Sequence, residues 1–238
     1  MSQKIAYVTG GMGGIGTAIC QRLAKDGFKV IAGCGPNSPR KDRWLAEQKA
    51  LGFDFTASEG NVGDWESTVA AFNKVKAEHG KVDVLVNNAG ITRDTVFRKM
   101  TPEDWRAVID TNLNSLFNVT KQVIDGMVDA GWGRIINISS VNGQKGQFGQ
   151  SNYATAKAGI HGFTMSLAQE TASKGVTVNT VSPGTLAQIW LQLSVKMCLR
   201  KLFQPFQLSV WEHLTRSLLL FLGWHLTKVV SQPVQTSR

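Results

Sequence analysis

The sequence predicts an α/β fold with a doubly wound parallel sheet, in a single domain over residues 1–184. Short apolar runs alternate with helical patterns from residue 4 to residue 184, as they do in parallel sheets flanked by helices. A glycine-rich loop separates the first predicted strand from the first predicted helix. The connections are short, and no repeat or linker interrupts the alternation, so we expect one domain.

Composition limits the classes of protein that fit. The chain has 238 residues, of which 42% are hydrophobic, enough for one sizeable core. The formal net charge is +9, and residues 185–238 carry much of it, because they contain six Lys and Arg but one acid, Glu212. A basic chain attracts anions. Because no nucleic-acid-binding motif is present, we expect an anionic cofactor or substrate and no nucleic-acid partner.

The cysteines and the apolar runs exclude further classes. Cys20, Cys34 and Cys198 lack metal-ligand spacing, and their odd number argues against a disulfide scaffold, so no metal site is expected. No signal peptide is visible before the first apolar run. The longest apolar run near the C-terminus, residues 218–222, is too short to span a bilayer. We therefore expect a cytoplasmic protein with no membrane partner.

The first predicted strand, residues 4–8, is followed by the glycine loop at residues 9–16 and by a helix at residues 17–25. A glycine loop between a strand and a helix places backbone N–H groups and the positive helix end where a pyrophosphate can bind. This context favours a dinucleotide-binding, Rossmann-type fold. The candidate cofactor-binding residues of the loop are Gly10, Met12, Gly13, Gly14, Ile15 and Gly16.

The second predicted strand, residues 28–33, lacks the acid that usually ends this strand in NAD-binding folds and binds the ribose hydroxyls. Arg40 follows a few residues later, and a guanidinium matches the oxygens of a 2′-phosphate. This favours NADP(H) as the cofactor. The alternative is that Arg40 is a solvated residue at a helix start.

Two further turns are candidates for cofactor contacts. A helix is expected at residues 41–51 and a strand at residues 53–58, before a turn at residues 60–64 that could meet the adenine. After a helix at residues 64–78, a buried strand at residues 82–86 ends in a polar turn. Polar groups at the carboxyl end of a parallel strand face the ligand crevice. The candidate residues in these turns are Asn61, Val62, Asn88, Ala89 and Gly90.

The second half of the domain contains an asparagine in an unusual position. Thr101 is suited to cap a helix, and a long helical segment is expected from about residue 110 to residue 130. Asn112 lies inside that segment, where an asparagine is unfavourable unless its side chain has a specific role. Asn112 is therefore a candidate functional residue.

A serine, a tyrosine and a lysine follow the next predicted strand, residues 135–138. Ser140 lies in the loop after this strand. Tyr153 and Lys157 are four residues apart on a predicted helix at residues 152–173, so they share one helix face. A phenol beside an ammonium, with a serine nearby, is a candidate proton-transfer group.

The last predicted strand, residues 176–181, ends just before Pro183 and Gly184. Taken in order, these motifs resemble those of the short-chain dehydrogenase/reductases. The matching residues are Thr9, Gly10, Gly14, Gly16, Asn87, Asn88, Ala89, Gly90, Asn112, Ser140, Tyr153, Lys157, Pro183 and Gly184. Because several independent motifs occur in the family's order and spacing, the chain is identified as a member of this family.

Within the family the chain is most similar to NADPH-dependent acetoacetyl-CoA reductases, on residues 33–38, 91–94, 97–100 and 144–150. The resemblance implies reduction of the C3 ketone of acetoacetyl-CoA or a similar 3-oxoacyl-CoA, as in polyhydroxybutyrate synthesis. The related 3-oxoacyl-[acyl-carrier-protein] reductases of fatty-acid synthesis are the main alternative. A catalytically dead nucleotide-binding protein is an alternative from another class.

The resemblance also implies a role for each candidate residue. Tyr153 would donate a proton to the developing alkoxide. Lys157, together with the charge of the nicotinamide, would lower the Tyr153 pKa, and Lys157 would also hold the nicotinamide ribose. Ser140 would orient the carbonyl, and Asn112 would hold a water that connects Lys157 to solvent. The cofactor would contact the glycine-loop and turn residues given above, together with Arg40, Tyr153, Lys157, Pro183 and Gly184. The implied substrate residues are Asp94, Gln147, Phe148 and Gln150.

After Gly184 the family pattern stops. Residues 185–191 can be encoded ACA CTG GCA CAG ATA TGG CTG. Read one base earlier, after a glycine codon ending in T, this string gives Tyr-Thr-Gly-Thr-Asp-Met-Ala, as the family pattern expects. Residues 207–216 and 229–237 allow further family motifs at the same offset.

Residues 185–238 are therefore interpreted as an aberrant tail, translated one base out of frame, in place of the family's last helix and strand. The alternative is a genuinely divergent C-terminus. In this family the last helix and strand usually build subunit contacts. The resemblance thus implies a homotetramer, and the tail would remove contacts that hold it together.

Overall fold

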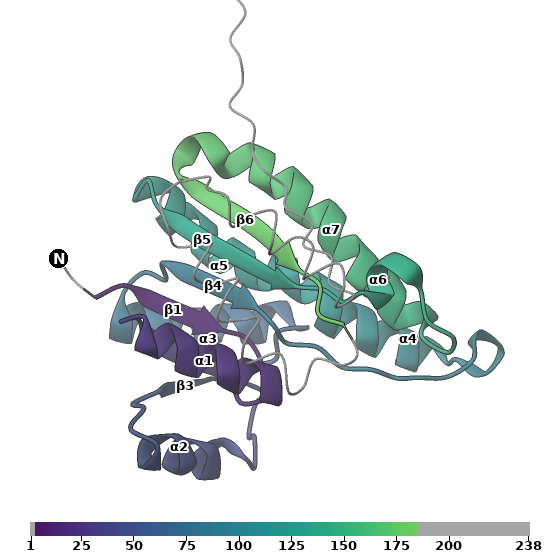
Figure 1. The fold of residues 1–238 in the computed structure, drawn as a ribbon, viewed down its shortest axis with the longest axis horizontal. Helices are drawn as coiled ribbons and strands as arrows, with labels where there is room; N and C mark the ends of the chain where they lie inside the picture. Colours follow the sequence, from purple (N-terminus) through teal and green to yellow (C-terminus); the bar gives the residue numbers. More distant parts are fainter. Residues whose placement is uncertain (1–2, 185–238) are drawn as a thin grey trace, which may run out of the picture.

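The computed structural model describes residues 3–184, which form a six-stranded parallel sheet with helices on both faces (Figure 1). The strand order is β3-β2-β1-β4-β5-β6, and every neighbouring pair is parallel. The strands are β1 (Ile5–Val8), β2 (Lys29–Cys34), β3 (Thr56–Glu59), β4 (Val84–Asn87), β5 (Gly133–Ile138) and β6 (Val176–Val181). The order reverses between β1 and β4, and ligands of such sheets bind beyond the carboxyl ends of the strands at this point.

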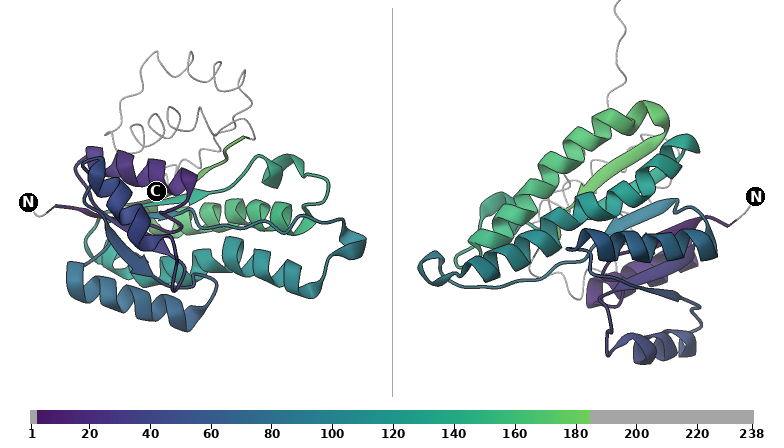
Figure 2. Two further views of the ribbon diagram at one scale, coloured as in Figure 1. Left: turned by 90° about the horizontal axis from the view of Figure 1, so that it is seen from below. Right: turned by 180° about the vertical axis from the view of Figure 1, so that it is seen from behind.

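The helices divide between the two faces of the sheet (Figure 2). They are α1 (Gly14–Lys25), α2 (Lys41–Ala50), α3 (Trp65–His79), α4 (Pro102–Ile109), α5 (Ser115–Asp129), α6 (Asn142–Lys145) and α7 (Ser151–Thr171). Helices α1 and α2 share one apolar cluster with the sheet, which contains Ile19 and Leu23 of α1. Helices α3, α5 and α7 share the cluster on the opposite face, around Phe72 and Val123. The two clusters hold these helices against the sheet.

The predicted fold class and the predicted order of strands and helices are confirmed within residues 3–184. The third strand begins at Thr56, later than predicted. Phe53 and Phe55, just before it, stack on each other with ring centroids 5.5 Å apart. Phe55 also stacks on Trp44 of α2, with centroids 5.3 Å apart. The predicted tail, residues 185–238, lies outside the described residues.

The long helix predicted from about residue 110 does not begin as an ordinary α-helix. Thr101 caps α4 as predicted, since its side chain accepts a hydrogen bond from the Asp104 N–H. A π-helical turn, Asp110–Asn114, then joins α4 to α5. Such turns are rare and occur often at functional sites. Asn112 lies inside this turn and is buried.

In the described part of the chain, no helix combines the length and apolar character needed to cross a membrane. The same residues contain no group of three or more His, Cys, Asp or Glu side chains arranged to bind a metal ion.

Candidate active site

The glycine loop after β1 is built so that backbones approach closely. Gly10 has φ +60°, a conformation that side chains other than glycine rarely adopt. A β-carbon placed on Gly16 would lie 2.1 Å from the Gly10 carbonyl oxygen, and one on Gly11 would lie 2.9 Å from Ala32. At Gly14, by contrast, a β-carbon would meet nothing within 4 Å. Gly10, Gly11 and Gly16 therefore shape the loop, while Gly14 leaves space above it.

Helix α1 starts directly from this loop. Its N-cap residue is Gly13, which has no side chain to accept a hydrogen bond from the first turn. The first N–H groups of a helix lack intrahelical partners, and the helix dipole favours an anion beside them. Met12 is buried and Ile15 is half-buried at the edge of this turn. The open space at Gly14 and the uncapped helix start fit the pyrophosphate of a dinucleotide.

The turn after β4 is tied to the glycine loop. The Thr9 hydroxyl accepts hydrogen bonds from the N–H groups of Asn88 (2.8 Å) and Ala89 (2.9 Å). The Asn88 side-chain amide donates to the carbonyls of Thr9 (3.0 Å) and Gly10 (3.1 Å). These four hydrogen bonds hold the turn after β4 against the glycine loop. The sequence patterns did not predict that Thr9 would connect the two segments, although a polar residue at the end of a strand is a signal for such a role.

Asn112 has the specific side-chain role that its buried position requires. Its side-chain oxygen accepts from the Ile91 N–H (2.8 Å), and its amide donates to the Ile91 carbonyl (2.9 Å). This pair of bonds holds the chain just after Gly90. A β-carbon on Gly90 would lie 3.3 Å from the Asn112 side-chain oxygen and 3.6 Å from the Lys157 ammonium nitrogen. The three residues therefore meet at one point, at the carboxyl edge of the sheet.

Ser140, Tyr153 and Lys157 come together as the sequence predicted. Ser140 is buried at the end of β5, and its side chain hydrogen-bonds the Tyr153 phenol. The Lys157 ammonium nitrogen lies 5.6 Å from the centroid of the Tyr153 ring and donates to the Ile138 carbonyl at 2.7 Å. Helix α7 supplies the tyrosine and the lysine on one face, and the loop after β5 supplies the serine.

Burial changes the proton affinity of both α7 residues. It raises the pKa of Tyr153 above its usual value, the Ser140 hydrogen bond partly offsets this, and the Asp94 carboxylate adds to it. The lowering of the Tyr153 pKa that the resemblance implies would come from Lys157 together with the charge of the bound nicotinamide, so it stays a prediction for the cofactor complex. Burial also lowers the pKa of Lys157 to about 8.

The Lys157 shift has a consequence for stability. A lysine in water has a pKa of 10.5, whereas the pKa of Lys157 in the folded chain is about 8, so between these values the unfolded chain binds the extra proton. The contribution of Lys157 to folding stability therefore becomes more favourable as pH rises from about 8 toward the pKa of the unfolded chain. A lysine that resists protonation in this way is common at functional sites.

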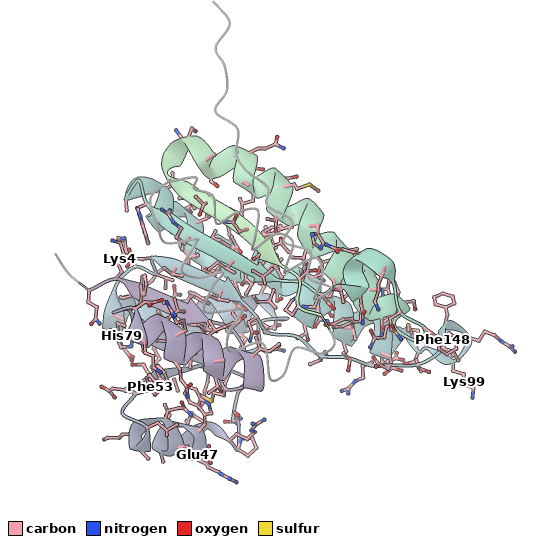
Figure 3. The ribbon with its side chains drawn as sticks, in the orientation of Figure 1. Lys4, Glu47, Phe53, His79, Lys99 and Phe148 are labelled. Carbon is pink, nitrogen blue, oxygen red and sulfur yellow. The ribbon has the colours of Figure 1, made fainter. Side chains whose placement is uncertain are left out.

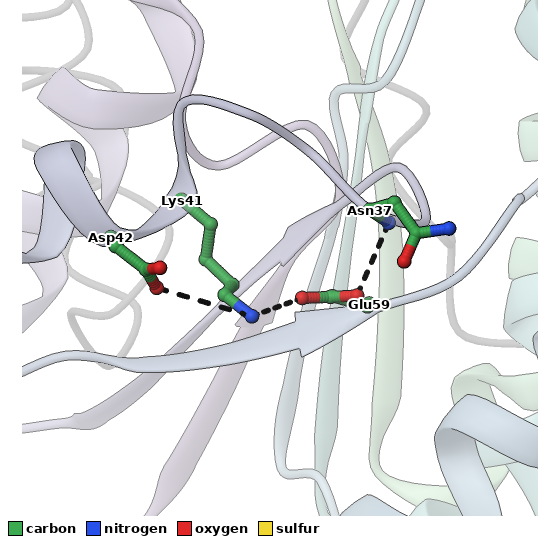
Figure 4. Close-up of polar contacts among 4 residues, drawn as sticks. All are labelled: Asn37, Lys41, Asp42 and Glu59. Atoms are coloured by element: carbon green, nitrogen blue, oxygen red, sulfur yellow. Dashed lines mark hydrogen bonds and ion pairs between the residues drawn. The ribbon is translucent and has the colours of Figure 1, made fainter.

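The segment between β2 and α2 contains Arg40, the residue that would select the cofactor. Arg40 is exposed immediately before α2 and lines a hollow with Arg43, Trp44 and Glu47. Its neighbour Lys41 forms an ion pair with Glu59 at the end of β3, while the Asn37 N–H donates to the other Glu59 oxygen (Figure 4). Within the described residues the Arg40 guanidinium has no ion pair, so it is the cation available for a phosphate.

Replacing Arg40 with Ala should weaken NADPH binding by about tenfold to a hundredfold, because a charge-assisted phosphate contact contributes roughly 1.5–3 kcal/mol. NADH binding should change little, since NADH lacks the 2′-phosphate. Fluorescence titration with both nucleotides measures this. Arg43→Ala is the matched control, because Arg43 lines the same hollow but pairs with Glu47. Equal weakening for both nucleotides would contradict the assignment.

The turn after β3 is held in place by its own contacts. The Asn61 side chain accepts from the Gly63 N–H at 3.1 Å, and the Val62 carbonyl accepts from the Asn118 amide at 3.0 Å. Asn61 is exposed and Val62 is half-buried. Both follow the carboxyl end of β3, on the same edge of the sheet as the other candidate cofactor residues.

Two of the four candidate substrate residues form one polar chain. The Gln150 amide donates to the Asp94 carboxylate at 2.8 Å, and Asn142, which was not predicted, donates to the Gln150 side-chain oxygen at 2.9 Å. Gln147 is exposed, and its carbonyl accepts from the Gln150 N–H. Phe148 is 86% exposed and projects, like Lys99, at the end of the molecule that carries α4 and α6 (Figure 3).

Pro183 and Gly184 lie at the limit of the described residues. Both are half-buried. The Pro183 carbonyl accepts from the Val141 N–H at 3.2 Å, which brings the segment after β6 beside the residue that follows Ser140. All candidate cofactor and catalytic residues thus follow strand ends at one edge of the sheet or lie on the helices next to them.

A family model described as short chain dehydrogenase matches residues 4–192. The chain belongs to the short-chain dehydrogenase family. The acetoacetyl-CoA reductase of Cupriavidus necator is 81% identical over 187 residues, which cover 79% of this chain and 76% of that protein. The 3-oxoacyl-[acyl-carrier-protein] reductase of Vibrio cholerae is 48% identical over 181 residues, 76% of this chain and 72% of that protein.

The solved structure of another dehydrogenase is also similar to this chain. The gluconate 5-dehydrogenase of Burkholderia cenocepacia, crystallised with NADP and tartrate, gives a TM-score of 0.71 at 29% sequence identity. The similarity covers 77% of this chain and 72% of that one. The family identified from the motifs is therefore confirmed.

Proposed function

We propose that this short-chain dehydrogenase is an NADPH-dependent oxidoreductase that reduces the C3 ketone of acetoacetyl-CoA, or of a similar 3-oxoacyl-CoA, to the 3-hydroxyacyl-CoA. The observation that carries the proposal is the hydrogen bond between Ser140 and Tyr153, beside Lys157, at the sheet edge where the glycine loop lies. The 81% identical relative named acetoacetyl-CoA reductase supports the choice of substrate. The solved relative bound to NADP supports the choice of cofactor.

The roles of the site residues follow from their chemistry. When bound, NADPH supplies the hydride, which is the part of the reaction that protein side chains cannot perform. Tyr153 donates its phenolic proton to the ketone oxygen as negative charge develops there. The Ser140 hydroxyl hydrogen-bonds the same oxygen and orients the carbonyl. Lys157 holds the nicotinamide ribose, and its positive charge stabilises the phenolate that remains on Tyr153.

Asn112 completes this arrangement by holding a water that links Lys157 to solvent. Both polar groups of the Asn112 side chain are engaged by Ile91. We assign the water to the Asn112 main-chain carbonyl, because the π-helical turn breaks the regular i to i+4 bonding of the helix there.

The acyl group is proposed to pass along Asp94, Gln147, Phe148 and Gln150. The chain of bonds through Asn142, Gln150 and Asp94 supports this, since it forms a preorganised polar wall next to Tyr153. Phe148, exposed beyond that wall, offers an aromatic surface to the acyl-CoA.

The test is a turnover assay that follows NADPH oxidation with acetoacetyl-CoA and, separately, with an acetoacetyl group on acyl carrier protein. A higher kcat/KM on the CoA thioester is the expected result. A preference for the carrier-linked thioester would support the carrier-protein reductase, a possibility raised by the 48% identical relative. NADPH binding in a fluorescence titration without turnover on either substrate would identify a catalytically dead nucleotide-binding protein.

We further propose that residues 1–184 form the dinucleotide-binding and catalytic domain and that residues 185–238 are translated one base out of frame. Three windows of the tail read as family motifs at the same offset, and this coincidence carries the proposal. The nucleotide sequence around codon 185 is the direct test. A coding sequence without that alternate reading would overturn the frame-shift.

A chain with the reading frame restored after codon 184 should turn over acetoacetyl-CoA at least about tenfold faster than the chain with the present tail. The reason is that sequence read out of frame has not been selected to cover the substrate. The restored chain should also form the homotetramer of the family, visible by analytical ultracentrifugation. Both chains should be compared at equal concentration of active sites. Near-normal turnover and a tetramer in the chain with the present tail would contradict this prediction.

A further inference from the structure

Lys157 is held at both ends by two adjacent residues at the end of β5. Its ammonium donates to the Ile138 carbonyl at 2.7 Å. Its main-chain carbonyl accepts a hydrogen bond from the Ser139 hydroxyl, also at 2.7 Å. Ser139 is 3% exposed and Lys157 is 4% exposed, so both bonds are shielded from water. A buried bond of this kind restrains the position of α7 relative to β5.

His161, one helical turn after Lys157, supports the serine from the other side. Its Nε2 lies 3.2 Å from the Ser139 hydroxyl oxygen. A hydroxyl has one proton to donate, and Ser139 directs it to the Lys157 carbonyl. The ring must therefore donate its Nε2–H to Ser139. Burial lowers the pKa of His161, so the neutral ring with hydrogen on Nε2 meets this requirement.

The Ser139 backbone is itself anchored, which makes it a suitable fixed point. Its N–H donates to the Val181 carbonyl of β6 at 2.7 Å. On the other side of Lys157 the backbone of Gly143 lies so close that a β-carbon there would be 2.7 Å from the Lys157 carbonyl carbon. The Lys157 backbone is thus enclosed between the end of β5 and α6.

We propose that Ser139 and His161 are positioning residues that set the distance between Ser140, just after β5, and the Tyr153–Lys157 pair on α7. Ser139 is the immediate neighbour of Ser140, and its bond reaches the lysine of the pair directly. Neither Ser139 nor His161 has to touch substrate or cofactor for this role. The catalytic consequence rests on the proposed function, while the geometric role does not.

Four variants and one control test the proposal in the full chain. Ser139→Ala and His161→Leu remove the hydrogen bonds, whereas Ser139→Thr keeps the hydroxyl and His161→Gln keeps an amide donor at similar reach. The control is Thr171→Val, which removes another buried hydroxyl, at the end of α7. Thr171 donates to the Leu167 carbonyl at 2.9 Å, far along α7 from the site. Thermal unfolding verifies that each variant folds.

The first readout is the ionisation of Tyr153, followed by ultraviolet difference absorption of the phenolate. The chain has two tyrosines, and burial raises the pKa of the other, Tyr7, to about 12, so the titrations are made in a Tyr7→Phe background in which only Tyr153 ionises. In Ser139→Ala and His161→Leu the Ser140 bond that lowers the Tyr153 pKa should weaken. The Tyr153 pKa should then rise by about one unit, roughly the effect of losing a hydrogen bond to the charged form.

Ser139→Thr, His161→Gln and Thr171→Val should titrate like the Tyr7→Phe chain. An unchanged Tyr153 pKa in Ser139→Ala, or an equal rise in Thr171→Val, would overturn the proposal. This readout needs neither cofactor nor turnover, so it holds whether or not the proposed function is correct.

The second readout is turnover with acetoacetyl-CoA. We expect kcat to fall about tenfold in Ser139→Ala with little change in KM, because a small displacement of catalytic groups affects the chemical step more than binding. Absence of turnover in every variant and also in the frame-restored chain, together with a shifted Tyr153 titration, would overturn the proposed function and support the positioning role. Normal turnover together with an unshifted Tyr153 titration would support the proposed function and overturn the positioning role.

Discussion

Replacing Tyr153 with Phe should lower kcat for acetoacetyl-CoA reduction by about a thousandfold, in the range of 10² to 10⁴ typical for loss of a general acid. The aromatic ring remains, so NADPH affinity and thermal stability should stay close to those of the unmodified chain. Steady-state kinetics and a fluorescence titration measure the two effects. The frame-restored chain should show the same ratio, because the substitution acts within residues 1–184.

Tyr7→Phe is the matched control for this prediction. It also removes one buried phenolic hydroxyl, which lies 3.2 Å from the Ser58 oxygen and has no role in the proposed chemistry. Its kcat should be unchanged. A similar loss of kcat in both variants would show that the effect is a general one of folding and would contradict proton donation by Tyr153.

The pH dependence follows from the same residue. Reduction needs the protonated phenol, and burial raises the Tyr153 pKa above its usual value. The rate should therefore be maintained at neutral pH and fall as pH rises through the Tyr153 pKa. Tyr153→Phe should lose this decline, because no phenol remains to ionise.

Gly16→Ala should abolish measurable NADPH binding, with at least a hundredfold loss expected because the glycine loop cannot keep its shape. The added β-carbon would lie 2.1 Å from the Gly10 carbonyl oxygen and 2.8 Å from the Gly11 α-carbon. Both are backbone atoms, which cannot rotate away as a side chain would. The strain should also lower stability by about 1–3 kcal/mol, as for other overpacked sites.

Nucleotide titration and thermal unfolding test this prediction, with Gly162→Ala as the control. Gly162 lies on α7, and a β-carbon there would meet nothing within 4 Å. That variant should bind NADPH normally and gain about 0.5–1 kcal/mol, since alanine is the better helix former. Normal NADPH affinity in Gly16→Ala would contradict the assigned role of the glycine loop.

Much of the site was predictable because its signals are local. The spacing of Tyr153 and Lys157 fixes a shared helix face, and the glycines of residues 9–16 define a strand–loop–helix unit. Apolar periodicity likewise predicted every strand of residues 3–184, since burial of alternate or continuous apolar residues is the main determinant of such elements. These properties need only neighbours within a few residues.

Other features were not predictable from local patterns. The π-helical turn at Asp110–Asn114 replaces an ordinary helix start, and the Asn112 side chain finds its partners in Ile91, twenty-one residues earlier. The rise in the Tyr153 pKa comes first from burial and is partly offset by the Ser140 hydrogen bond, and no local pattern reveals either effect. Each depends on the final packing.

The sequence by itself determined the fold class and the family, and it supplied the candidate proton-transfer group of Ser140, Tyr153 and Lys157. Only the tertiary structure decided which polar residues hold that group in place. Thr9 reaches across 79 residues to Asn88, and Ser139 and His161 meet from separate elements around the backbone of Lys157. Such bonds join segments distant along the chain, and they form only after hydrophobic burial has brought the strands and helices together.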